Sequence, residues 1–305
     1  MRARWWLNLA LLALVAVLAA VAWYQPGKQP PHKSPPLTTL EPDQVTHIHV
    51  TRPGDKALTL VKRNGHWRMT APFDLRANAV RINGLLRLCT TTSQRSFAYK
   101  PAKAAEYGLD HPRATVRLND TEIVFGGSQP VNHHRYVRIG DRIHLITDHM
   151  TYYLLSRATA FIDLSPLGPD DHPVGFDLPG GVTLSAKDGH WHAQPAKALT
   201  STDAVAALLQ HWRDAHAIEI RNYPPEKQKA QSGERVSIRL DGDKAPLHFD
   251  VVSKKPELIL GRRDIGIEYV LPADSAEHLL QLQSPKSTSS KPPRSPAGAS
   301  APPAS

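Results

Sequence analysis

The chain has 305 residues, a formal net charge of +9 and one cysteine, Cys89, which is enough length for one large domain or two ordinary ones. A single thiol excludes an intramolecular disulfide and a zinc site built from several cysteines. The excess positive charge lies at the two ends of the chain, in residues 1–36 and 284–305. Because a nucleic-acid-binding domain carries its basic face on the fold itself, nucleic acid is not an expected partner.

Residues 5–24 form an uncharged, apolar segment with a pair of aromatic residues at each end. Twenty helical residues span the roughly 30 Å hydrocarbon core of a bilayer, and aromatic side chains favour its interfaces. With Arg2 and Arg4 in front, residues 1–24 are predicted to be a cytoplasmic tip and a transmembrane anchor. The bulk of the chain would then be periplasmic, at a bacterial inner membrane, with the bilayer as a partner of residues 5–24. A cleaved signal peptide is the alternative, since Ala20-Val21-Ala22 fits a cleavage site.

Two segments have the composition of unfolded chain. Residues 25–36 contain five prolines, which favour an extended, semi-rigid linker. Residues 284–305 are rich in Ser, Pro and Ala and contain no large apolar side chain, so they are predicted to be a disordered tail. The folded part is therefore expected between residues 37 and 283.

A tripeptide occurs twice in the folded part, as Gly65-His66-Trp67 and Gly189-His190-Trp191. Each glycine follows an Asn or Asp, and such a pair favours a tight hairpin turn because both residues accept positive φ. Each tryptophan then begins the returning strand and is expected to contribute to the core. We interpret the tripeptide as the same hairpin turn, followed by the same start of a strand, occurring twice.

An amphipathic helix is predicted after each hairpin. Apolar residues recur at helical spacing from Ile82 to Cys89 and again from Val205 to Trp212, with Asn78 as one N-cap and Thr202 or Asp203 as the other. Strands with similar sequences follow both helices. These patterns predict an α+β fold, in which a transmembrane helix precedes an internally duplicated, β-rich ectodomain of hairpin, helix and strands. Its repeats are expected at residues 37–164 and 165–283.

The segment Glu106-Tyr107-Gly108-Leu109-Asp110-His111-Pro112 resembles the signature of a bacterial family described as domain of unknown function 4340. The hairpin before it and the strand after it fit the same family, over residues 37–280. The resemblance implies a membrane-anchored, extracytoplasmic protein, and some relatives resemble auxiliary components of transport systems. It implies no catalytic residues. In physical terms, Tyr107, Gly108 and Pro112 are interpreted as structural, because Gly and Pro end a helical turn and begin a strand.

The histidines are the main chemical candidates. His47 and His49 lie two apart on one predicted strand face, a spacing that can hold a metal, yet the sequence places no third ligand, so they are weak candidates. Gly126-Gly127 is interpreted as a turn. No nucleotide-binding, metalloprotease or nucleophile motif is present. No cofactor and no enzymatic activity are therefore expected.

These observations lead to three hypotheses about function. The first is a membrane-anchored periplasmic interaction or assembly module, accessory to an envelope or transport complex, with an envelope or inner-membrane protein as its partner. The second is a periplasmic protein that binds a glycan or peptide in a cleft between the repeats. The repeats are expected to meet at a joint in the Pro-, Gly- and Asp-rich residues 165–175. Exposure of Phe161, Phe176 and Tyr223 near this joint would favour the second hypothesis. The third, a hydrolase, has the least support.

Overall fold

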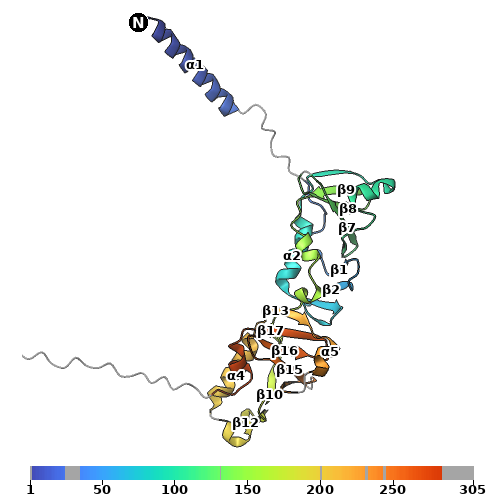
Figure 1. Ribbon diagram of the computed structural model, residues 1–305, viewed down its shortest axis with the longest axis vertical. Coiled ribbons are helices and arrows are strands. Elements are labelled where there is room, and N and C mark those ends of the chain that lie inside the picture. Colours follow the sequence, from blue (N-terminus) through green and yellow to red (C-terminus); the bar gives the residue numbers. More distant parts are fainter. Residues whose placement is uncertain are drawn as a thin grey trace, which may run out of the picture.

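Figure 1 shows the computed structural model, which describes residues 2–24, 35–130, 132–199, 201–230, 233–242 and 245–283. The predicted linker and tail therefore lie almost wholly outside the described residues. The α-helices are α1 (Arg2–Tyr24), α2 (Ala79–Thr90), α3 (Thr151–Leu154), α4 (Thr202–Asp214), α5 (Pro225–Ala230) and α6 (Ser275–Leu279). Short 3-10 helices are η1 (Pro42–Gln44), η2 (Pro101–Tyr107), η3 (Ala158–Phe161) and η4 (Ala196–Ala198).

The first half of the folded part is one antiparallel sheet, whose strands lie in the order β4-β3-β2-β1-β6-β7-β8-β9-β5. Alternating exposed and buried residues along β1 show that the sheet buries one face and leaves the other open. The strands are β1 (His47–Thr51), β2 (Leu58–Arg63), β3 (His66–Ala71), β4 (Leu75–Arg76), β5 (Arg95–Ala98), β6 (Ala114–Leu118), β7 (Thr121–Ser128), β8 (Arg135–Ile139) and β9 (Arg142–Ile146).

The second half is another antiparallel sheet, with the order β12-β11-β10-β14-β15-β16-β17-β13. Apart from β4, this order repeats that of the first sheet, and α2 and α4 occupy equivalent places in the chain. The strands are β10 (Pro173–Leu178), β11 (Val182–Lys187), β12 (His190–Gln194), β13 (Glu219–Asn222), β14 (Arg235–Leu240), β15 (Leu247–Ser253), β16 (Leu258–Arg262) and β17 (Ile267–Leu271).

The repeated tripeptide occupies the same place in both sheets. Asn64 and Gly65 have positive φ in the turn between β2 and β3, and Asp188 and Gly189 have positive φ in the turn between β11 and β12. Two residues at positive φ form the turn that matches the twist of a hairpin. The two glycines are therefore turn residues, as the sequence predicts.

The prediction of an α+β class is wrong, because the folded part is mostly β. Two large antiparallel sheets form its body, and α2 and α4 are single short helices of 12 and 13 residues. In the structure each of these helices packs on a large antiparallel sheet.

The predicted transmembrane helix also needs correction. The segment concerned is helical, as part of α1. However, no helix in the described part of the chain is both long and apolar enough to cross a membrane.

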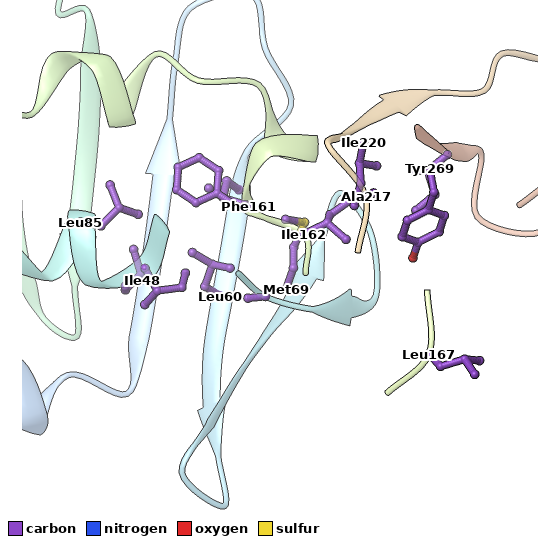
Figure 2. Close-up of a cluster of buried hydrophobic side chains, with 14 of the residues drawn as sticks. Ile48, Leu60, Met69, Leu85, Phe161, Ile162, Leu167, Ala217, Ile220 and Tyr269 are labelled. Atoms are coloured by element: carbon purple, nitrogen blue, oxygen red, sulfur yellow. The ribbon is translucent and has the colours of Figure 1, made fainter. Parts of the chain in front are cut away.

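The two sheets share one apolar core that continues through the joint between them. Figure 2 shows Phe161 and Ile162 beside side chains of the first sheet, and Leu167 on the side of Tyr269 of the second sheet. The backbone ties the halves as well, because the amide of Ala217 in the second repeat donates to the carbonyl oxygen of Leu164 in the first. The joint is therefore a packed interface and not an open cleft.

Several predicted packing details are confirmed and two are corrected. Cys89 is buried, and Asn78 caps α2 by accepting a hydrogen bond from the amide of Arg81. The cap of α4 is Ser201 instead of Thr202 or Asp203, since the helix begins one residue earlier than expected. Trp67 and Trp191 pack against the core but are only partly buried.

Candidate interaction surface

The structure places the candidate histidines on the solvent side of the first sheet. His47 and His49 are exposed on β1, and their Nδ1 atoms lie 2.9 Å from the hydroxyl of Thr46 and 3.0 Å from that of Thr59. Across the described residues, no three His, Cys, Asp or Glu side chains come together in a way that could hold a metal ion. The geometry therefore gives these histidines hydroxyl partners and brings no further ligand to them.

The family-like segment forms a tight backbone contact. Tyr107 ends η2, and Gly108 follows at φ 62°. A side chain at Gly108 would lie 2.8 Å from the amide nitrogen of Gly127, and one at Gly126 would lie 2.3 Å from the carbonyl oxygen of Tyr107. The interpretation of Gly126-Gly127 as a turn is thus wrong, because both residues belong to β7 and admit this neighbouring segment. Pro112 lies in the loop that leads from this contact to β6.

The aromatic residues expected to line a cleft are buried instead. Phe161, Phe176 and Tyr223 are almost inaccessible to solvent. Phe161 fills the joint, and Phe176 packs against Trp191 and Trp212. The exposure that would favour a ligand cleft between the repeats is therefore not found at these three positions.

Exposed apolar side chains occur on or beside elements that contact one another near the junction of the two sheets. Among the described residues after α1, the large hydrophobic side chains that are clearly exposed are Val80, Tyr152, Leu155 and Ile218. Val80 is in the first turn of α2, Tyr152 is on α3, and Leu155 follows α3 directly. Ile218 precedes β13, which contacts η3 of the joint. The other large hydrophobic side chains of the described residues after α1 are less exposed than these four.

An arginine stacked on two tyrosines forms the centre of this region. The guanidinium carbon of Arg81 lies 5.4 Å from the ring centroid of Tyr152 and 5.9 Å from that of Tyr153. The two rings meet edge to face at 5.6 Å. Cations are attracted to aromatic faces at such distances. We call Val80, Arg81, Tyr152, Tyr153 and Leu155 the Arg81 surface.

A glycine in the middle of α2 makes this arrangement possible. Gly84 has ordinary helical backbone angles, but a side chain there would lie 2.5 Å from a ring carbon of Tyr153. Val80 and Arg81 stand one turn before Gly84 and therefore share its side of the helix. A mid-helix glycine costs about 1 kcal/mol relative to alanine, and here it lets the tyrosine approach the helix. This glycine was the available sequence signal for the surface, which the prediction from the sequence missed.

Both ends of α3 are held by charged side chains. Asp148 accepts hydrogen bonds from the amide and the hydroxyl of Thr151, and it pairs with the buried Arg135 at 2.6 Å. Buried Arg52 donates to the carbonyl oxygens of Leu154 and Ser156, on either side of Leu155. A four-residue helix has little intrinsic stability. These contacts therefore fix the part of the chain that presents Tyr152 and Leu155.

Asp148→Asn should give a pH-dependent loss of stability. Burial by itself raises the pKa of Asp148, but the hydrogen bonds from Arg135 and Thr151 outweigh it and hold the pKa below its ordinary value. The stabilisation is therefore present above the unfolded pKa of about 3.9 and is lost as pH falls through the folded pKa. At neutral pH the free energy of unfolding should fall by about 2 kcal/mol.

Urea unfolding of both proteins from pH 7 to pH 3 measures this effect. The difference between parent and variant should shrink below about pH 4. Asp188→Asn is the matched control, because Asn64 already occupies the equivalent turn, and it should change little. A difference that stays constant across this range would show that the carboxylate charge of Asp148 has no such role.

The surface of the described residues also has hollows. A groove of about 390 Å³ is lined by Thr51, Arg52, Pro53, Asp110, His111, Pro112 and Thr115. A hollow of about 250 Å³ lies beside α4 and α6, where the rings of His211 and His278 stack at 4.5 Å. The first hollow contains the end of the family-like segment, and the second lies near the joint.

The comparisons with known proteins identify a family. The model of a domain of unknown function, DUF4340, matches residues 67–231, whereas no curated protein and no solved structure matches the chain. The matched region runs from β3 in the first sheet to the end of α5 in the second. It therefore includes the joint, the Arg81 surface and the Tyr107 segment, and it covers more than half of the sequence. The chain belongs to the DUF4340 family.

Proposed function

We propose that this chain is a non-catalytic interaction module that binds another protein through the surface around its joint. The observation that carries the proposal is the exposure of Val80, Tyr152 and Leu155 on and beside α2 and α3, which contact each other and which the stacking of Arg81 on Tyr152 joins. Ile218 is likewise exposed, before β13, which contacts η3. Exposed apolar residues concentrated in one region are typical of a protein–protein contact. The buried aromatics and the closed joint add support, since they leave less room for a ligand between the repeats.

The assembly that the family resemblance suggests is an envelope or transport complex, with this chain as an accessory component. A location outside the cytoplasm stays a prediction. The geometry favours binding through a surface that keeps its shape. The residues that present this surface are held in place by the ion pair between Arg135 and Asp148 and by the shared core.

The test is site-specific photocrosslinking of the full chain in its native cells. A photoreactive residue at Tyr152 or Ile218 should give one discrete adduct, whereas the same residue at exposed Lys187, in the β11–β12 hairpin, should give none. Val80→Asp should remove the adduct without changing the amount of protein. Affinity purification of the captured protein, once tagged, should in turn recover this chain. Adducts of equal yield at all three positions, or adducts insensitive to Val80→Asp, would contradict the proposal.

The groove beside the family-like segment supports a second candidate function, the binding of a small glycan or peptide. Its volume of about 390 Å³ is within the usual range for small-ligand sites, and the exposed His111 side chain supplies a polar group. Cell-wall glycan fragments and short peptides, titrated into the purified full chain, should then raise its melting temperature. The effect should be lost in His111→Ala and kept in Val80→Asp. Absence of any shift at millimolar concentration would argue against this function.

A further inference from the structure

We propose that the Arg81 surface binds an acidic, apolar segment of a partner protein, with Arg81 paired to a carboxylate of that segment. The inference rests on the proposed function and names the chemistry of the partner. Arg81 is half-buried and stacked on two tyrosine rings, and within the described residues its side chain has no carboxylate partner.

Other arginines near the joint are already neutralised. Arg76 pairs with Asp163 at 3.2 Å, and Arg135 pairs with Asp148 at 2.6 Å. Asp148, which caps α3, and Asp163 are thus each engaged by an arginine. Arg81 is thus a positioned cation whose charge is left for a group outside the described fold.

The segments that form the surface contribute no negative charge of their own. Residues 79–90 contain Arg81 and Arg87, residues 149–162 contain Arg157, and neither segment contains an acidic residue. Charges at protein interfaces are arranged to be complementary. The complementary partner therefore carries Asp or Glu side chains.

The apolar part of the surface requires apolar side chains in the same partner segment. Val80 and Tyr152 expose 75% and 68% of their surface, and Leu155 exposes 45%. Tyr and Arg are enriched among residues that dominate binding energy, and a stacked guanidinium is already ordered for a two-pronged contact with a carboxylate. Arg81 is therefore expected to be the specificity-determining residue of the surface.

An anionic membrane fits these observations less well than a protein. Lipid-binding sequences concentrate about four to eight basic residues in one cluster, whereas this surface has one stacked arginine with Arg87 and Arg157 nearby. Mobile lipid headgroups would also present no acceptor at a fixed position, so the ordered, planar guanidinium of Arg81 would gain no specific contact from them. The observations therefore favour a protein segment with a placed carboxylate.

The experiment selects random-sequence peptides displayed on phage against the purified full-length protein. The selected peptides should be rich in Asp and Glu beside Leu, Ile or Phe. One synthetic selected peptide should bind Arg81→Glu at least about tenfold more weakly than the parent. Arg87→Glu, a charge reversal on the same helix, should bind within about twofold. Replacement of the acidic residues of the peptide by Asn and Gln should weaken binding to the parent as much as Arg81→Glu does.

Several results would overturn the inference. Selected peptides without acidic residues, or equal binding by parent and Arg81→Glu, would remove the role of the carboxylate. Binding of the parent, but not of Arg81→Glu, to phosphatidylglycerol vesicles would assign the surface to lipid. A concentration-dependent dimer lost in Arg81→Glu would assign it to a second copy. If the photocrosslinked adduct at Tyr152 persists in Arg81→Glu, the interaction function stands and this inference fails. If no adduct forms around the joint, the proposed function itself fails.

Discussion

Trp212→Ala should be the most destabilising of the tryptophan substitutions, with a loss of about 3–5 kcal/mol in the free energy of unfolding. Trp212 is fully buried, packs on Phe249 at 5.3 Å and donates its indole N–H to the carbonyl oxygen of Leu279 on α6. Its removal leaves a cavity and an unpaired buried carbonyl. The loss should extend through both halves, because the two sheets share one core.

Trp191→Ala is the control for this prediction, because it removes a tryptophan that is only partly buried. Trp191 contacts the same Phe176 ring but is only partly buried, so its loss should be about 1–3 kcal/mol, in proportion to the apolar area that it covers. Trp212→Phe should retain most of the packing and lose mainly the hydrogen bond. Urea unfolding followed by circular dichroism measures all three variants. Equal losses for Trp212→Ala and Trp191→Ala would refute the distinction between a buried and a partly buried tryptophan.

Lys227→Ala should lower the free energy of unfolding by about 3 kcal/mol, because it would leave a charged carboxylate buried without its partner. The side chain of Glu268 on β17 is only 2% exposed, and both of its oxygens accept hydrogen bonds from Lys227 on α5, at 2.7 and 2.6 Å. This pair is the contact that attaches α5 to the second sheet. The half-exposed lysine thus has a larger effect than its position at the surface suggests.

Lys229→Ala is the matched control, since Lys229 is exposed on the same helix, and it should change stability by no more than about 0.5 kcal/mol. The double variant Lys227→Met, Glu268→Met should recover most of the loss, because apolar side chains of similar size often replace a buried ion pair at little cost. Urea unfolding measures the free energy of unfolding of the parent, of the two single variants and of the double variant. A double variant as unstable as Lys227→Ala would show that the damage comes from lost packing and not from the unpaired charge.

Much of the local structure follows from the sequence. The pairs Asn64-Gly65 and Asp188-Gly189 determine the two hairpin turns, since few other residues accept positive φ at both positions. The apolar spacing from Ile82 to Cys89 determines the buried face of α2. These features depend on neighbours within a few residues, and for that reason the sequence predicts them.

The fold class and the surface depended on contacts between distant residues. The sequence predicts a duplicated, β-rich unit but assigns it to the α+β class, whereas the strand order shows that two large antiparallel sheets dominate the folded part. Phe161, Phe176 and Tyr223 read as candidates for a cleft, and their burial follows from the packing of the joint. Long-range β pairing leaves only a weak local pattern, which is why this part of the prediction was wrong.

The sequence by itself determined the hairpin turns, the capped helix α2 and the membership of the DUF4340 family. Only the tertiary structure decided where Arg81 lies relative to Tyr152 and Tyr153, because these residues are about 70 positions apart and their contact requires Gly84 to admit a ring from another segment. The same holds for Arg52, which reaches from the end of β1 to the carbonyls beside Leu155. Such contacts depend on packing in three dimensions, and no periodicity along the chain records them.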